Sequence, residues 1–247
     1  MDLQTDALHS EDKDLQREFN RWAEAGRGDE MEEHHSDIAQ QTLAMMNLQP
    51  ADRVLDLGCG TGWASRRMAK LAPQGEVVGL DVADGMLHRA KRASSGFNNI
   101  RFLWGSAESI PAADGHFTKV LSVESFYYYA NQGKSLDELR RVMAPGGQLF
   151  ILINLYKDNP YSLQWVDKLQ VPVHVRSAAE YGELLGKHAY EEISWEQIPD
   201  DTPTPDDYKT KSFHSLADLR AFKKTGALLL MASKPDLRTP APGYTIY

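Results

Sequence analysis

The chain has 247 residues, 42% hydrophobic and 25% charged, with a formal net charge of −8. These proportions are ordinary for a globular protein, and the length suits one α/β domain. No apolar run approaches the ~20 residues of a membrane-spanning helix, so we expect no membrane partner. The negative charge disfavours phosphate backbones, so we expect no nucleic acid partner.

The cysteine and histidine content limits which disulfides and metal sites are possible. Cys59 is the only cysteine, so no intrachain disulfide is possible. The first residues are polar and acidic, unlike a secretory or transit peptide, and we expect a cytoplasmic protein. His34 and His35 are adjacent but show no metal-ligand spacing, so we expect no metal. The arginine pairs at 66–67 and 140–141 fall on expected helices and are interpreted as solvated faces.

Two amphipathic helices are predicted before the first strand. Apolar side chains recur at helical spacing in two sets, Leu15, Phe19 and Trp22, then Ala39, Leu43 and Met46. Ser36 is a plausible N-cap of the second helix. Residues 26–35, GRGDEMEEHH, are polar with two glycines and are predicted to form a loop or hinge.

A regular alternation of strands and helices follows. Five short segments are apolar on both faces, as in a covered parallel sheet: 53–57, 77–81, 100–104, 117–123 and 148–155. Apolar stripes at helical spacing separate most of them, at 64–71, 86–93 and 136–143. This pattern predicts a doubly wound α/β sheet with right-handed crossovers.

The last third of the chain is less regular. Residues 177–189 are predicted to be helical with Ser177 as N-cap, and 191–198 to form a strand. Residues 199–207, PDDTPTPDD, are a loop by composition. A helix over 215–225 and a strand over 227–233 follow, and the proline-rich tail should lie over the surface or be disordered.

The glycine-dense segment 54–62, VLDLGCGTG, carries the strongest functional signal. Glycines between a strand and a helix let the backbone approach a ligand closely. The spacing G-x-G-x-G differs from the dinucleotide pattern G-x-G-x-x-G. Asp56 before the first glycine would repel a pyrophosphate but can receive a cationic amino group. Asp81, ~20 residues after the turn, can accept the hydroxyls of a ribose.

Four segments together resemble the class I S-adenosylmethionine-dependent methyltransferases, in particular the bacterial small-molecule enzymes. They are VLDLGCGTG, VVGLDVADGMLHRAK, GSAESIPAADGHFTKV and ELRRVMAPGGQLFIL, in the order of the family's motifs. The resemblance covers residues 52–155. It implies a Rossmann-like, mostly parallel seven-stranded sheet with helices on both faces, whose antiparallel last strand lies inside the edge.

The resemblance also implies one methyltransferase domain over 1–247. We expect an N-terminal helical cap over 1–50, a cofactor-binding core over 51–156, an acceptor-side half over 157–234 and a tail over 235–247. The implied cofactor is S-adenosylmethionine, and the implied partner is a small-molecule acceptor, bound by a monomer or homodimer.

Residue roles follow from the same resemblance. Asp56 and the glycines would line the methionine part of the cofactor, and Asp81 would hold the ribose. Ser106 and Lys119 stand where the family usually has aspartates. The expected cofactor-binding residues are Trp22, Asp56, Gly58, Cys59, Gly60, Gly62, Asp81, Val82, Met86, Ser106, Ala107, Glu108 and Glu124.

The acceptor should lie beyond the end of the fourth strand, at ESFYYY. Tyr127, Tyr128, Met31 and Tyr208 are the expected acceptor-binding residues. Glu124 and His34 are the candidate catalytic residues. Glu124 could act as a base, but a role in orienting the cofactor or the acceptor is preferred. One histidine of the pair at 34–35 either takes the acceptor's proton or belongs to a solvated loop.

A lid is predicted from two segments. Strand 191–198 should run parallel to its neighbours and deliver 199–215 to the ligand side, where long loops often close over a site. Residues 19–35 should approach the same mouth. The expected reaction is in-line displacement that yields S-adenosylhomocysteine. The alternatives are a methyltransferase for a macromolecule such as tRNA and a catalytically silent cofactor-binding protein.

Overall fold

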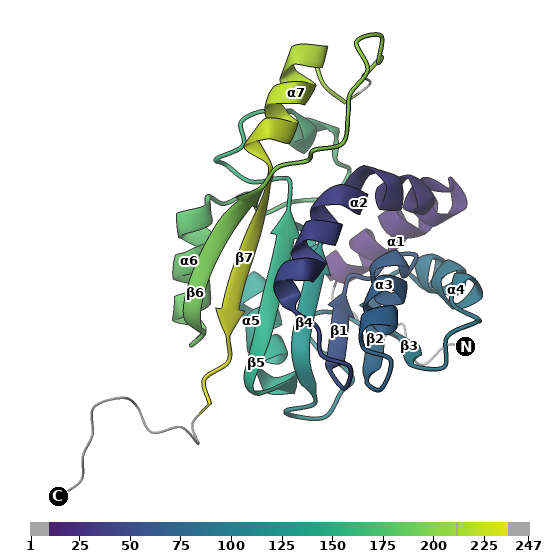
Figure 1. Ribbon diagram of the computed structural model, residues 1–247, viewed down its shortest axis with the longest axis vertical. Helices are drawn as coiled ribbons and strands as arrows, with labels where there is room; N and C mark the ends of the chain where they lie inside the picture. Colours follow the sequence, from purple (N-terminus) through teal and green to yellow (C-terminus); the bar gives the residue numbers. More distant parts are fainter. Residues whose placement is uncertain (1–9, 211, 237–247) are drawn as a thin grey trace, which may run out of the picture.

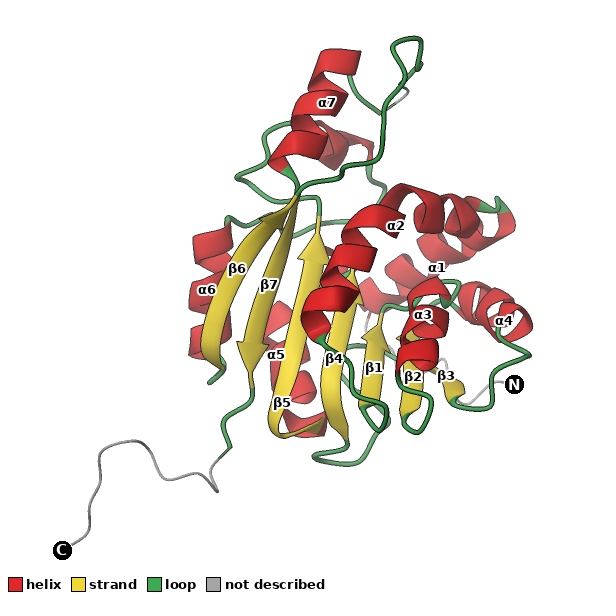
Figure 2. Ribbon diagram, in the orientation of Figure 1, coloured by secondary structure: helices red, strands yellow, loops and turns green. Residues whose placement is uncertain are grey.

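A seven-stranded sheet with helices on both faces forms the body of the molecule (Figures 1 and 2). The computed structural model describes residues 10–210 and 212–236. The strands are β1 Arg53–Leu57, β2 Glu76–Asp81, β3 Ile100–Trp104, β4 Phe117–Val123, β5 Met143–Ile153, β6 Glu191–Ile198 and β7 Ala227–Ser233. The helices are α1 Ser10–Glu24, α2 Arg27–Met46, α3 Trp63–Leu71, α4 Asp84–Ala93, α5 Gln132–Val142, α6 Ala178–Lys187 and α7 Leu216–Thr225, with 3-10 turns η2 Phe126–Tyr128 and η3 Leu163–Lys168.

The strand order is β3-β2-β1-β4-β5-β7-β6. Strands β1 to β5 pair in parallel, and β7 is antiparallel to both β5 and β6, between which it lies. This confirms the predicted fold, including the last strand inside the edge. Strand β5 begins at Met143, earlier than the expected residue 148. Met143 pairs with Phe117 of β4, and a shift in register separates this pair from the regular pairing that starts at Gln148 and Lys119.

Two hydrophobic cores hold the layers together. On one face of the sheet, α2 and α3 bury Leu43 and Met68 against strand side chains such as Leu121. On the other face, Leu136 of α5 and Tyr181 of α6 pack on the sheet. Strands β1, β2, β4, β5 and β7 are therefore largely buried, as their apolar sequences predict, whereas β6 at the edge is mostly exposed.

The N-terminal prediction needs a correction. Helix α2 begins at Arg27, so 26–35 is not a loop, and Ser36 lies inside the helix instead of capping it. A two-residue turn, Ala25 and Gly26, separates α1 from α2, and Gly26 has φ 75°. A polar segment stays helical here because Met31, His35 and Ile38 share one face and turn inward.

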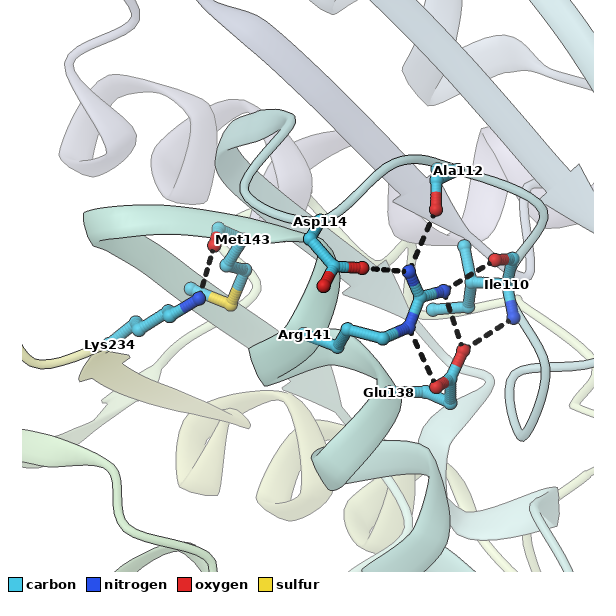
Figure 3. A network of polar contacts seen from close by, with 7 residues as sticks. All are labelled: Ile110, Ala112, Asp114, Glu138, Arg141, Met143 and Lys234. Atoms are coloured by element: carbon cyan, nitrogen blue, oxygen red, sulfur yellow. Dashed lines mark hydrogen bonds and ion pairs between the residues drawn. The ribbon is translucent and has the colours of Figure 1, made fainter.

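The arginine pairs are not merely solvated. Arg67 donates to Ser36 Oγ at 2.8 Å and lies 3.3 Å from Glu32, which joins α3 to α2. Arg141 donates to the carbonyls of Ile110 and Ala112 and pairs with Asp114 and Glu138, which fastens the loop before β4 to α5 (Figure 3).

A small lobe stands beyond the ends of β6 and β7, formed by α7 with its preceding loop and η3 (Figure 1). Trp165, Phe213 and Phe222 contact one another there, with ring centroids 4.9–5.6 Å apart. Lys223 of α7 donates to the carbonyl of Thr202 at 2.6 Å, which binds the loop at 199–210 to this lobe. The start of the same loop bonds α2, where Gln41 donates to the Pro199 carbonyl at 2.9 Å and Asp37 accepts from the Asp201 amide at 3.0 Å. In the part of the chain described here, no helix is long and apolar enough to span a membrane. Most of the predicted tail, 237–247, lies outside the described residues.

Candidate cofactor and acceptor site

One cavity lies at the carboxyl ends of β1, β2 and β4, beneath α1 and the first turns of α2 (Figure 1). Its floor is the turn after β1 and the residues that follow β2, β3 and β4. Its roof comes from the inner faces of the two N-terminal helices. The open end of a parallel sheet therefore meets the helices that precede β1, which is the usual ligand position in this architecture.

The turn after β1 needs glycine for two different reasons. A β carbon on Gly58 would lie 2.5 Å from Ser125 Cβ, so the close approach of β1 and β4 excludes a side chain. Gly60 has φ 51° and open space beyond its α carbon. The left-handed backbone favours glycine there, and the bare main chain faces the cavity.

Asp81 is fixed at the end of β2 by two main-chain donors. Its Oδ2 accepts from the Gly60 amide and its Oδ1 from the Ala83 amide, each at 2.8 Å. Burial raises the pKa of Asp81, and these donors oppose that rise. The carboxylate borders the cavity with its oxygens preorganised to accept further hydroxyl donors.

Asp56 lies underneath the turn and is not part of the cavity wall. Its side chain is buried, and Ser65 Oγ donates to it at 2.5 Å. Burial raises the pKa of Asp56 to about 6, although the Ser65 hydrogen bond works in the opposite direction. Asp56 therefore braces the start of α3 and acts on the cavity only through its charge.

Cys59 borders the cavity but is unsuited to nucleophilic catalysis. The thiol is buried, and burial raises its pKa well above the ordinary value, with the nearby carboxylates of Asp81 and Asp56 adding to the rise. Because the thiolate is the reactive form, this cysteine contributes shape and apolar surface.

Glu124 occupies a strained position directly after β4, with φ 51°. Its Oε1 accepts from the Asn154 amide at 2.5 Å and its Oε2 from the Tyr127 hydroxyl at 3.0 Å. The side chain is buried yet borders the cavity. Burial raises the pKa of Glu124, while the neighbouring His35 and these donors oppose the rise.

The histidine facing this carboxylate is His35, not His34. His35 Nε2 lies 4.0 Å from Glu124 Oε2, and its side chain is only 11% exposed. His34 is exposed on the outer face of α2 and does not border the cavity. The helical path of 27–46 explains the correction, since neighbouring residues on a helix point about 100° apart.

Aromatic side chains of α1 and η2 form one part of the cavity wall, which we call the aromatic wall. Phe19 packs edge-on against Tyr128 with centroids 5.1 Å apart, and Trp22 lies 5.0 Å from Phe19. The Arg27 guanidinium sits 4.1 Å above the Trp22 ring. Helix α1 thus brings apolar rings onto the 3-10 turn after β4, where acceptor contacts were expected.

Many of the predicted site residues meet at this cavity. They are Trp22, Met31, Gly58, Cys59, Gly60, Asp81, Val82, Met86, Ser106, Ala107, Glu124 and Tyr128. Six others do not line it, namely His34, Asp56, Gly62, Glu108, Tyr127 and Tyr208.

The positions of His34 and Asp56 are explained above, and physical reasons account for the other four. Gly62 packs on Phe102, Tyr127 lies behind Glu124 as its hydrogen-bond donor, and Glu108 accepts from the Asn131 amide at 3.0 Å where α5 begins. Tyr208 is 48% exposed in the α7 lobe.

The predicted lid over 199–215 is likewise absent from the cavity wall. Strand β6 points in the same direction as β1 to β5, but its one partner is the antiparallel β7. Three strands, β4, β5 and β7, separate it from β1, and the loop that leaves it bonds Asp37 and Gln41 of α2 without lining the cavity.

The sequence assigned no individual site role to several residues of the wall. These are Asp12, Leu15, Gly28, Thr61, Trp63, Ser125 and Tyr129. A usable signal existed for four of them, because Leu15 belongs to the apolar stripe of α1 and the other three lie in VLDLGCGTG and ESFYYY, namely Thr61, Ser125 and Tyr129. His35 was one of the two histidines considered as the base, and it continues the apolar stripe of α2 toward its N-terminus.

The side chains and backbone that line the cavity suit S-adenosylmethionine chemically. Asp81 offers carboxylate oxygens beside the bare backbone of Gly60, and Val82, Met86 and Ala107 supply an apolar surface next to it. In 10–210 and 212–236, no group of three or more His, Cys, Asp or Glu side chains is arranged to hold a metal ion.

Comparisons with known proteins point in one direction. Residues 54–147 match a family model described as a methyltransferase domain. A demethylmenaquinone methyltransferase of Thermus thermophilus is 42% identical over 101 residues, which are 40% of this chain and 46% of that protein. A demethylmenaquinone methyltransferase of Listeria monocytogenes serotype 4a is 28% identical over 169 residues, covering 66% of this chain and 68% of that protein. Against the first two curated relatives, the chain spans about half of their length.

Solved structures extend the likeness to nearly the whole chain. A chain from a complex that contains the Trm112 methyltransferase activator of Haloferax volcanii superposes with a TM-score of 0.81 and 30% identity. The match covers 88% of this chain and 98% of that one. The YcgJ protein of Bacillus shares the fold, with a TM-score of 0.61 at 19% identity.

Proposed function

Since the chain belongs to the class I S-adenosylmethionine-dependent methyltransferases, we propose that it methylates a small, largely apolar molecule bound beneath α1 and α2. The observation that carries this proposal is the continuity of the cavity. One cavity is lined both by Asp81 and Gly60 and by Tyr128, Glu124 and His35. Donor and acceptor can therefore meet within one enclosed site.

On the cofactor side, each residue has a role suited to its environment. Asp81 accepts the ribose hydroxyls, and the backbone at Gly58 and Gly60 follows the methionine part. Val82 and Met86 cover the adenine, with Ser106 and Ala107 at its edge. When bound, the cofactor supplies a methyl carbon made electrophilic by the attached positive sulfur.

On the acceptor side, the chain supplies alignment and exclusion of water. Phe19, Trp22 and Tyr128 form a flat apolar wall suited to a ring-containing molecule. The relatives named demethylmenaquinone methyltransferases act on such molecules by their names, which supports the same class here. Holding the two reactants in line inside a dry cavity can lower the barrier by several kcal/mol (roughly 7–11 at best).

Two alternatives have less support. A macromolecular substrate such as tRNA would have to approach a chain of net charge −8, at a cavity roofed by two helices. A catalytically silent binding protein would not need polar atoms beside the acceptor wall, yet His35 and Glu124 both face the cavity there.

The test combines binding with turnover. Titration calorimetry should show S-adenosylmethionine binding, and the purified protein should form S-adenosylhomocysteine with members of a panel of hydroxylated benzenes and naphthalenes. The assay is run with and without the Trm112 activator, because one structural relative comes from a complex that contains it. Binding without product from any acceptor in either condition would favour the silent protein, and product only with tRNA would favour the macromolecular alternative.

A further inference from the structure

We propose that His35 is the base that takes the proton of an acidic hydroxyl group on the acceptor, and that Glu124 positions it and balances its charge. This inference rests on the proposed function and narrows the acceptor to hydroxylated aromatic molecules. It is carried by the hydrogen bonds of His35 and by the surroundings of Glu124.

The tautomer of His35 is set by the main chain. Its Nδ1 lies 2.8 Å from the carbonyl oxygen of Met31, one helical turn earlier. A carbonyl only accepts, so Nδ1 carries the hydrogen and donates it. In the neutral ring, Nε2 is then a free lone pair, and the same bond fixes the plane of the imidazole. This nitrogen is on the side of the ring toward Glu124, within the cavity wall.

Glu124 is held in place by two donors. The Asn154 amide and the Tyr127 hydroxyl donate to its two oxygens, and together with His35 they oppose the rise in its pKa that burial causes. At 4.0 Å from Nε2, the carboxylate is too distant for a strong hydrogen bond but close enough to stabilise a protonated imidazole. The arrangement differs from a Ser-His-Asp triad, in which the carboxylate contacts Nδ1, because here a main-chain carbonyl orients Nδ1 and the carboxylate lies beside the reactive Nε2.

Five other titratable side chains border the same cavity, namely Asp12 of α1, Cys59, Asp81 at the end of β2, Tyr128 of η2 and Tyr129. Burial raises the pKa of the Cys59 thiol well above its ordinary value. Burial also raises the pKa of Tyr128 and of Tyr129, so their hydroxyls keep their protons and cannot replace His35 as a base. Asp81 is occupied with the turn after β1. The lone pair of His35 is therefore the proton acceptor best placed for the acceptor side.

The chemistry of this site selects the substrate class. The aromatic wall favours a ring, and the free lone pair of Nε2 requires a donor from that ring, which a phenolic hydroxyl supplies. The O–H bond breaks and its proton goes to Nε2. The electron pair left on the aromatic anion, at oxygen or at a conjugated carbon, forms the bond to the methyl carbon. The carbon–sulfur bond breaks with its pair on sulfur, and the proton later leaves His35 for solvent.

The experiment uses a phenol whose ionisation is visible. 4-Nitrophenol is added to the full-length protein saturated with S-adenosylhomocysteine, and the absorbance of its anion is recorded at a pH below the phenol's own pKa. We expect binding to the wild type to increase the anion band. His35→Gln should bind 4-nitrophenol in its neutral form, and Glu124→Gln should give an intermediate band.

His34→Gln is the matched control, because it makes the same change one residue away on the exposed face of α2. It should behave as wild type. In turnover, we expect His35→Gln to lose about 10²–10⁴-fold in kcat with weakly acidic phenols and progressively less with more acidic ones. If His35 had only a structural role, His35→Gln would lower kcat by the same factor for every acceptor.

Several outcomes would overturn the inference. An unchanged anion band in His35→Gln, equal losses in His34→Gln, or no phenol binding to the wild type would each do so. Calorimetry with S-adenosylhomocysteine separates the proposals. If the wild type fails to bind it, the proposed function fails. If all variants bind it normally and the phenol results are negative, only the role of His35 fails.

Discussion

Gly28, in the first turn of α2, lies directly against Thr61 in the turn after β1. A β carbon on Gly28 would stand 2.4 Å from Thr61 Cγ2 and 3.3 Å from Met86 Sδ. The Thr61 hydroxyl also reaches the Gly28 carbonyl at 3.4 Å. Because α2 carries Met31 and His35 into the cavity, this contact sets how closely the N-terminal helices approach the glycine turn.

Gly28→Ala should therefore weaken S-adenosylmethionine binding. Alanine favours the helix itself by ~1 kcal/mol, but its methyl group must push α2 away from Thr61. We expect the dissociation constant to rise about tenfold or more, or ~1.4 kcal/mol. Adding Thr61→Ser, which removes the opposing methyl group, should restore most of the affinity. Calorimetry on the two single variants and the double variant tests this, and additive losses would contradict it.

Asp81→Asn tests the ribose contact. The amide retains one acceptor oxygen but loses the charge and places a donor against the amides of Gly60 or Ala83. We expect affinity for S-adenosylmethionine to fall by ~1–3 kcal/mol. Asp137→Asn, at an exposed site beside His188, is the control and should bind normally. Equal affinities for wild type and Asp81→Asn would remove this carboxylate from the site.

Asp56 should give the protein a measurable pH dependence of stability. Its folded pKa, about 6, lies above its ordinary value near 4, so the folded state binds more protons than the unfolded state between these values. The free energy of unfolding therefore falls as pH rises through that window, by up to ~3 kcal/mol. Asp56→Asn lacks this titration and keeps an acceptor for Ser65.

Urea unfolding without cofactor, from pH 4 to pH 7.5, measures the effect. Wild type and Asp56→Asn should be similar near pH 4, and the variant should become the more stable protein by ~2–3 kcal/mol above pH 6.5. Comparing the two proteins cancels the other shifted carboxylates, among them Glu124 and Glu76. Parallel pH profiles would show that Asp56 is not the group responsible.

The sheet was predictable because its signals are local. Each strand of the core is a short apolar run between turn residues, and motifs such as VLDLGCGTG fix which end of the sheet faces the ligand. Asp81 and Gly60 were identified for that reason, since both lie where a strand ends. The antiparallel position of β7 came from family resemblance and not from its own residues.

The residues that form the roof of the cavity were harder to predict from the sequence. His35 and His34 are chemically identical in the sequence, and only the start of α2 at Arg27 decides which one turns inward. The polar composition of residues 26–35 predicted a loop, so it did not indicate that the helix begins there. Tyr208 was misplaced for a different reason: the reach of a loop depends on where its strand lies in the sheet, and β6 lies at the edge. Order in the sheet is a non-local property that composition does not record.

The last prediction separates the two proposed covers of the site. Phe19 touches both Trp22 and Tyr128, so Phe19→Ala should open the aromatic wall and loosen α1 over the cavity. We expect a stability loss of ~3 kcal/mol or less, because Phe19 is only partly buried, together with weaker acceptor binding and faster amide exchange in α1. Tyr208→Ala removes an aromatic side chain of the α7 lobe, 48% exposed, and should leave stability, acceptor binding and amide exchange in α1 unchanged.

Hydrogen exchange with bound S-adenosylhomocysteine adds a direct readout, since protection should increase in α1 and the start of α2 but not across 199–210. If protection instead appears in that loop, or if Tyr208→Ala impairs acceptor binding as strongly as Phe19→Ala, the α7 lobe is part of the cover after all.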